Sequence, residues 1–309
     1  MASQGEPRTR GKATSLRSWL GYALLRLGSL VVRILGVSAA SSLTGLLFRT
    51  VGPLTRRHPR IATNLALALP HTAAEDRTLI ASRQWDSLGR TLAETLGMAQ
   101  IVGDPVRFEL IVAPDLDRKL RQRGSRGVVF VSCHMANWEA AAYPLNRYGK
   151  IAGLYQRLTD PLAEAYVRSL RELAFQDGML PKEPETVRRT MMRVRAGGSV
   201  GMLADLYEKR GIRVDFFGHP TSATPFPAML ARRLDALLVT VHMTRLPHSR
   251  FRTELEEIVV PVTDDVTDDV RATTQAVLAR FEAWIRASPG DWMWVQNRWR
   301  ATSERNAGR

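Results

Sequence analysis

The sequence contains a single cysteine, Cys133, among its 309 residues. One cysteine cannot form an intramolecular disulfide, so no disulfide framework is expected to stabilise the fold. The six histidines are scattered, and none belongs to a cluster with the spacing of a zinc site. A glycine-rich phosphate-binding loop is also missing. We therefore expect neither a metal ion nor a cofactor.

Acidic residues are scarce. The chain has 30 Asp and Glu against 44 Lys and Arg, which gives a net charge of +14. With 45% hydrophobic and 24% charged residues the composition is that of a globular protein, which excludes a disordered or collagen-like chain. A mean hydropathy of -0.17 excludes a protein with many membrane spans. The charge favours an anionic partner, such as nucleic acid, anionic lipid or an acidic carrier protein.

The excess positive charge is concentrated near the N-terminus. Residues 1–60 carry ten basic side chains and one acidic side chain, a net +9 of the +14. The same stretch is rich in aliphatic residues, a mixture typical of a segment that lies on an anionic membrane surface. A nucleic-acid-binding tail would be polar, and no nucleic-acid-binding module is recognisable, so nucleic acid is not an expected partner.

Other interpretations of this apolar stretch stay open. A spanning helix is less favoured, because the longest run without a charge extends only from Ile34 to Phe48 and a span needs about 20 residues. A tilted span whose arginines reach the interface remains compatible with the pattern. So do ordinary helices over residues 19–54 that pack on the core. A signal peptide is disfavoured, since no clear cleavage site follows the apolar region.

The hydrophobic pattern divides the chain into four parts. These are a disordered basic tail (1–15), hydrophobic membrane-associating helices (16–58), a main domain (59–300) and a polar tail (301–309). In the main domain short β-rich runs alternate with amphipathic helices, which indicates an α/β fold with helices on both faces of a sheet. The predicted strands include 128–131, 151–155, 199–204, 214–217, 237–243 and 251–260. The predicted helices include 61–69, 74–98, 161–176, 185–195, 226–234 and 268–287.

Polar residues follow two of the predicted strands. His134 comes just after the run 128–131, and Asp205 directly follows 199–204. Ligands of α/β sheets gather at the carboxyl ends of the strands, so we expect the site there.

The segment from His134 to Glu139 is the sharpest chemical signal. On one continuous helix these two residues would point roughly 140° apart and would not meet. They can meet if His134 lies on a turn, Asn137 caps a following helix and Glu139 sits in its first turn. Glu139 would then accept the Nδ1 proton and leave Nε2 as a general base for a substrate hydroxyl. A histidine bonded to a backbone carbonyl beside a solvated Glu139 would give the same spacing.

The pattern His134-x-x-Asn137-Trp138-Glu139 resembles the HX4D/E block of glycerolipid acyltransferases. It more closely resembles the late acyltransferases of lipid A biosynthesis and the related phosphatidylinositol mannoside acyltransferases. Four other segments resemble further blocks of the same family in the same order, at residues 60–70, 155–162, 214–232 and 289–300. Several motifs in the same order between about residue 20 and residue 300 indicate the family far more specifically than any single motif does.

The resemblance implies a mixed sheet flanked by helices, with an N-terminal hydrophobic helical membrane anchor. It also implies transfer of a fatty acyl group to a hydroxyl of a membrane glycolipid, and a lipid A precursor is the first candidate acceptor. The donor would be a thioester of acyl carrier protein or CoA, and the enzyme would lie on anionic lipid at the cytoplasmic face of a bacterial inner membrane. His134 would be the general base, Glu139 would orient it, and residues 59–300 would form the acyltransferase domain. No acyl-enzyme is implied. Because neighbouring strand residues point to opposite faces, Cys133 is expected to be a small buried side chain rather than a nucleophile.

Arginines near such a site suit contacts with phosphate or with the oxyanion of the thioester. The three tryptophans of residues 292–299 fit a membrane interface or the core equally well. The predicted substrate-binding residues are Asn137, Arg157, Arg171, Asp205, Arg232 and Arg298.

Three positions depart from the family pattern. Gln156 stands where the family usually has Arg, Leu206 where it has Gln or His, and Phe226 where it often has Gly. The catalytic block is intact while the substrate-facing blocks are altered. The sequence therefore determines the type of reaction more closely than the identity of the acceptor lipid. The alternatives are an acyltransferase for another phospholipid or glycolipid, and a catalytically degenerate lipid-binding paralogue.

Overall fold

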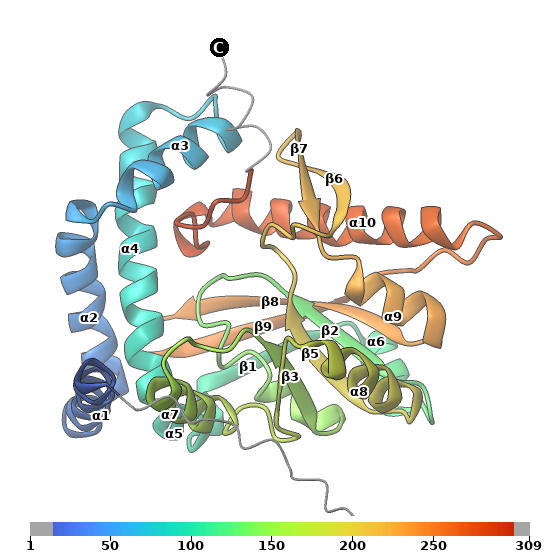
Figure 1. Cartoon of the computed structure of the whole chain (residues 1–309), viewed down its shortest axis with the longest axis horizontal. Coiled ribbons are helices and arrows are strands. Elements are labelled where there is room, and N and C mark those ends of the chain that lie inside the picture. Colours follow the sequence, from blue (N-terminus) through green and yellow to red (C-terminus); the bar gives the residue numbers. More distant parts are fainter. Residues whose placement is uncertain (1–14, 300–309) are drawn as a thin grey trace, which may run out of the picture.

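The computed structural model describes residues 15–299. The two predicted tails lie outside these residues, except for Ser15, whose side chain caps the first helix. The centre of the molecule is a seven-stranded sheet with the order β1-β9-β8-β2-β5-β3-β4, flanked by helices (Figure 1). The α-helices are α1 (Leu16–Leu35), α2 (Val37–Val51), α3 (His58–Ala68), α4 (Ala74–Leu96), α5 (Met98–Val102), α6 (Pro114–Arg121), α7 (Pro161–Arg171), α8 (Pro184–Arg195), α9 (Phe226–Leu234) and α10 (Val266–Ala287).

The sheet is mixed, as predicted. Neighbouring strands are parallel except for β8 and β9, which are antiparallel. A separate hairpin of β6 and β7 turns at Phe217 and Gly218, both of which have positive φ. The strands are β1 (Phe108–Val112), β2 (Val128–Ser132), β3 (Ile151–Tyr155), β4 (Met179–Pro181), β5 (Ser199–Leu203), β6 (Ile212–Phe216), β7 (His219–Ala223), β8 (Leu237–Leu246) and β9 (Arg250–Glu257).

Strand β2 lies at the middle of the sheet, and each of its five residues is buried. Val129 and Val131 belong to one core cluster, and Val128 and Phe130 to another on the opposite face. Layers on both faces explain why the sequence of this strand is apolar without alternation.

The predicted helix after His134 does not form. Met135 forms an isolated β-bridge with Trp292, residues 136–143 make bends and turns, and a short 3-10 helix, η3 (Pro144–Tyr148), follows them. Ala136 adopts a positive φ of 49°, and its N–H donates to the Asp291 carbonyl oxygen instead of to a helical partner. The strands β1, β4 and β7 and the helix α6 were not predicted. They are short or polar, so their hydrophobic patterns carry little information.

The N-terminal helices form a layer of their own at one side of the molecule (Figure 1). Helix α2 packs on α4 so closely that a Cβ atom on Gly89 would collide with the carbonyl oxygen of Thr44. Within the described residues α1 is the only helix long and apolar enough to cross a membrane. Most of its large apolar side chains are exposed, so it is not an ordinary core helix. By contrast, Trp292, Trp294 and Trp299 are buried and belong to the core.

Candidate active site

His134 and Asp205 meet at the carboxyl ends of two neighbouring strands. Strands β2 and β5 run parallel with Ser132 opposite Leu203, so the residues that follow them lie side by side. The Nδ1 atom of His134 lies 2.8 Å from Oδ1 of Asp205. The other carboxylate oxygen, Oδ2, accepts hydrogen bonds from the His134 backbone N–H (2.9 Å) and from Nε1 of Trp292 (2.7 Å). Asp205 is fully buried, and three donors therefore fix its orientation.

The surroundings of Asp205 favour its ionised form. Burial by itself would raise the pKa of this carboxyl, but the charge of His134 and the hydrogen bonds from His134 and Trp292 outweigh it, and the pKa lies below its ordinary value. An ionised carboxylate is only an acceptor, so Nδ1 is the donor of this hydrogen bond and Nε2 is the ring nitrogen left for other partners. The neighbouring thiol behaves differently. Burial, with the charge of Asp205 added, raises the pKa of Cys133 well above its ordinary value. Cys133 is buried, as predicted, and holds its proton.

The expected contact between Glu139 and the imidazole is not made. Both oxygens of Glu139 accept from Arg171, at 2.7 Å from Nε and 2.6 Å from Nη2, and Nε1 of Trp138 adds a third donor at 3.3 Å. The physical reason is the missing helix: the turns after His134 send Glu139 towards the end of α7, while Asp205 takes the position beside Nδ1.

Arg171 ends α7 and lies over the ring of Tyr155, with 5.7 Å from its guanidinium carbon to the ring centroid. Burial opposes the charge of Arg171, but the carboxylate of Glu139 outweighs that effect and raises the pKa of the guanidinium. The two parallel hydrogen bonds of this bidentate pair hold the guanidinium in a fixed orientation.

His134, Glu139 and Arg171 line one cavity of about 700 Å³. Apolar residues from both faces of the sheet contribute to its lining, so the cavity passes around the carboxyl ends of the strands. Charged side chains lie elsewhere along the lining. On one face the lining includes Phe130, Ile151, Phe175 and Gly201, on the other Leu154, Met202 and Ala204, and the charged lining residues include Lys182, Glu183, Glu208 and Lys209.

Two other predicted residues lie near this cavity without lining it. Arg157 is half exposed and pairs with Glu183, a lining residue, at 2.8 Å. Asn137 is buried, and its side-chain oxygen accepts from the Ala140 N–H at 3.2 Å, so it caps a turn rather than a helix.

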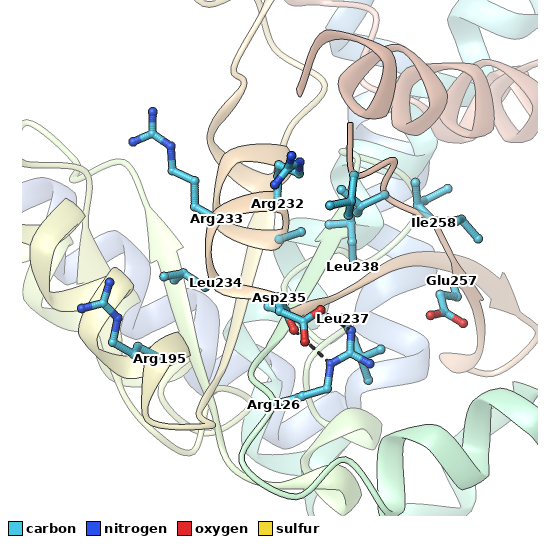
Figure 2. A pocket seen from close by; sticks show the side chains of 15 residues that line it. Arg126, Arg195, Arg232, Arg233, Leu234, Asp235, Leu237, Leu238, Glu257 and Ile258 are labelled. Atoms are coloured by element: carbon cyan, nitrogen blue, oxygen red, sulfur yellow. Dashed lines mark hydrogen bonds and ion pairs between the residues drawn. The ribbon is translucent and has the colours of Figure 1, made fainter. Parts of the chain in front are cut away.

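Arg232 belongs to a different part of the molecule. It bonds Asp269 at 2.7 Å and lines a second pocket of about 620 Å³ (Figure 2). That pocket is bordered by Arg126, just before β2, and by Leu237, the first residue of β8. It therefore lies at the opposite end of these parallel strands from His134.

Arg298 is also separate from the cavity lining. It is fully buried beneath the hairpin, where Nη1 donates to Thr221 Oγ1 (2.7 Å) and to the Ser222 carbonyl oxygen (2.8 Å). Its guanidinium lies 5.0 Å from the centroid of the Phe216 ring. Burial lowers the pKa of Arg298 to about 10, although the charge of Asp205 acts in the opposite direction.

The positions that depart from the family pattern have a shared location. Gln156, Leu206 and Phe226 all line the cavity around His134. Sequence reasoning placed Asp205 at the site but missed its contact with His134. The available signal was that both residues follow strands that could pair directly.

Among residues 15–299, no group of three or more His, Cys, Asp or Glu side chains comes together in a way that could hold a metal ion. The cavity brings together a histidine–carboxylate pair, a buried arginine–carboxylate pair and a large apolar surface. This arrangement suits proton removal from a hydroxyl next to an apolar chain.

Comparison with known proteins identifies the family of the chain. The family model described as bacterial lipid A biosynthesis acyltransferase matches residues 6–301. Phosphatidylinositol mannoside acyltransferase of Mycobacterium tuberculosis (strain CDC 1551 / Oshkosh) is 28% identical over 259 residues, which cover 78% of this chain and 77% of that protein. The enzyme of the same name from Mycolicibacterium smegmatis is 30% identical over 59% of this chain and 60% of its own length. Lipid A biosynthesis palmitoleoyltransferase of Escherichia coli (strain K12) is 24% identical over 80% of each chain. The chain belongs to the bacterial lipid A biosynthesis acyltransferase family and is an acyltransferase.

Proposed function

We propose that this acyltransferase moves a fatty acyl chain from a thioester of acyl carrier protein or CoA to a hydroxyl of a membrane glycolipid. The observation that carries the proposal is the bond between His134 Nδ1 and the buried Asp205 carboxylate, at the wall of a large apolar cavity. His134 is the general base. Asp205 orients it, in the place that the sequence assigned to Glu139.

The transfer balances without an acyl-enzyme. Nε2 of His134 takes the proton of the acceptor hydroxyl while the hydroxyl oxygen bonds to the thioester carbonyl carbon. The carbon–sulfur bond then breaks, and the imidazolium returns the proton to the leaving thiolate. The ionised Asp205 stabilises the imidazolium between these steps.

Glu139 acts through Arg171 in this proposal. Its carboxylate holds the guanidinium at the cavity wall, where a fixed positive charge can stabilise the thioester oxyanion or a phosphate of the substrate. The apolar wall holds the acyl chain, since burial of each methylene is favourable by about 0.8 kcal/mol.

The relatives support a glycolipid acceptor. Some are named for phosphatidylinositol mannoside and others for lipid A. We propose a lipid A precursor, because the matching family model is named for lipid A biosynthesis. A mannosylated phosphatidylinositol is the second candidate, and the relatives named for it have higher identities than the relative named for lipid A. The donors are acidic, and the basic surface of the protein would attract either of them.

The arrangement of α1 supports docking on a membrane surface rather than a span. Tyr22 and Arg26 contact the ring of Tyr166 on α7, whose hydroxyl donates to Ser29 at 2.6 Å, and Val32 one turn further is buried. One side of α1 therefore follows the catalytic domain along most of its length. The other side exposes a row of apolar residues: Leu16, Leu20, Leu24, Leu27, Leu30 and Ile34.

An exposed apolar side on a helix with three arginines fits the interface of an anionic bilayer, and we propose the cytoplasmic face of a bacterial inner membrane. A variant with Leu20, Leu24 and Leu27 replaced by Asp should leave the membrane fraction. The matched control replaces three exposed valines elsewhere, Val106, Val259 and Val262. Retention of the α1 variant in the membrane fraction would refute the docking surface.

The test of the function combines a deletion strain with the purified enzyme. Mass spectrometry of lipids from the deletion strain should show one acyl chain missing from one glycolipid, and the wild-type gene should restore it. A His134→Ala variant that is folded should not restore it and should not transfer acyl groups in vitro. A folded His134→Ala enzyme with wild-type turnover would overturn the mechanism.

A further inference from the structure

A buried polar network lies behind the turn that carries His134. Its centre is Arg245, near the end of β8, whose guanidinium bonds both oxygens of Glu94 on α4 at 3.0 to 3.2 Å. Both side chains are nearly or completely buried, and Ser41 on α2 also donates to Glu94, at 2.9 Å. The network therefore joins the N-terminal helix layer, α4 and the central sheet.

The network reaches the His134 turn through Thr91. Its hydroxyl donates to the Ala136 carbonyl oxygen at 2.6 Å, while Nη2 of Arg245 donates to the same hydroxyl oxygen at 2.8 Å. The Thr91 proton has a second possible acceptor, the Ser87 carbonyl oxygen at 2.8 Å. Arg245 also approaches that carbonyl, at 3.4 Å, and so leaves the hydroxyl proton free for Ala136.

Ala136 needs such support because its backbone is strained. Its φ of 49° lies in the left-handed region that residues with a Cβ atom seldom adopt. Besides Thr91, the Asp291 carbonyl oxygen holds the turn by accepting from the Ala136 N–H at 3.2 Å. Asp291 is itself connected to the network, because Ser87 donates to its carboxylate at 3.2 Å.

We propose that Thr91 and Arg245 are positioning residues for the general base, which they hold in place through the strained turn at Ala136. The inference rests on the proposed function, since it assigns these residues a role in the reaction of His134. Neither side chain lines the cavity, so neither touches substrate. A shift of the turn would move His134 relative to both Asp205 and the bound hydroxyl.

The main test replaces Thr91 by Val, which keeps the shape of the side chain and removes the hydroxyl. We expect kcat for acyl transfer to fall about 10- to 100-fold, the usual cost of misplacing a catalytic group, with KM for donor and acceptor unchanged. Thr91→Ser should restore kcat, because it restores the donor. The matched control is Thr95→Val, one turn along the same helix. Within the described part of the chain, its buried hydroxyl bonds only the Thr91 carbonyl oxygen.

A second pair of variants tests Arg245 without leaving a buried charge unpaired. Arg245→Met combined with Glu94→Gln should lower kcat in the same way as Thr91→Val. The control is the ion pair Arg90 and Asp86 on the same helix, α4, changed to Met and Asn. If this control variant folds, its kcat should stay within about twofold of the wild-type value, since the pair has no connection to the turn.

The outcomes separate this inference from the proposed function. Equal kcat values for folded Thr91→Val and Thr95→Val, with His134→Ala inactive, would overturn the positioning role alone. Equal losses in both, matched by equal losses of thermal stability, would also overturn it, because the effect would then be one of stability. An active His134→Ala would overturn the proposed function itself.

Discussion

Replacement of Asp205 by Asn tests whether Asp205, and not Glu139, is the carboxylate that orients His134. Asn has the same shape as Asp, and its amide oxygen can occupy the position of Oδ2, where the His134 N–H and Trp292 Nε1 both donate. The amide NH₂ group then faces Nδ1 of His134, at the position of Oδ1. Two donors cannot bond to each other, so Nδ1 must become the acceptor, and the proton moves to Nε2. The variant would fold correctly with the wrong tautomer at the base.

The size of the effect follows from the loss of an unprotonated Nε2. A wrong tautomer in a histidine–carboxylate pair costs about 10³- to 10⁴-fold in kcat. At 1.36 kcal/mol for each factor of ten, this corresponds to about 4 to 5.5 kcal/mol of transition-state stabilisation. KM should stay near the wild-type value, because Asp205 is fully buried and meets no substrate.

The assay measures initial rates of acyl transfer by the purified enzyme, with Glu139→Gln as the comparison. The amide oxygen of that variant can still accept a hydrogen bond from Arg171, so we expect kcat/KM to fall by about tenfold or less. The reasoning is refuted if Glu139→Gln loses 10³-fold or more while Asp205→Asn keeps over a tenth of the wild-type kcat. That result would return the orienting role to Glu139.

Three further predictions concern stability, the thiol and the cavity. The pKa of Asp205 is lower in the folded than in the unfolded protein. Its contribution to stability is therefore complete above the unfolded pKa of about 4 and is lost as pH falls through the folded pKa. Between pH 6 and pH 3 the urea midpoint should fall more steeply for the wild type than for Asp205→Asn. Cys133→Ala should keep its activity within about twofold, and thiol-blocking reagents should not inhibit the folded wild type, since burial keeps the thiol protonated. A Cβ atom on Gly201 would lie 3.3 Å from Phe175 in the cavity wall, so Gly201→Val should shift the products to shorter acyl chains by mass spectrometry, and Phe175→Ala to longer ones.

The sequence by itself determined the parts of this protein that depend on local pattern. The apolar runs of β2 and β5 predicted buried strands, and the residues after them, His134 and Asp205, do lie together at the sheet edge. Ordered motifs determined the family, and the family determined the type of reaction. The burial of Cys133 also followed from local reasoning, because strand neighbours alternate in direction.

Tertiary structure decided which carboxylate serves the histidine. Glu139 is five residues from His134 along the chain and Asp205 is 71 residues away, yet Asp205 is the residue that bonds the imidazole. The choice depends on the pairing of β2 with β5 and on the strained turn at Ala136, which turns Glu139 away. That turn is held by partners far along the chain, Thr91 and the Asp291 backbone. Long-range hydrogen bonds of this kind leave no periodicity in the sequence, and they exist only once the sheet and the helices have assembled.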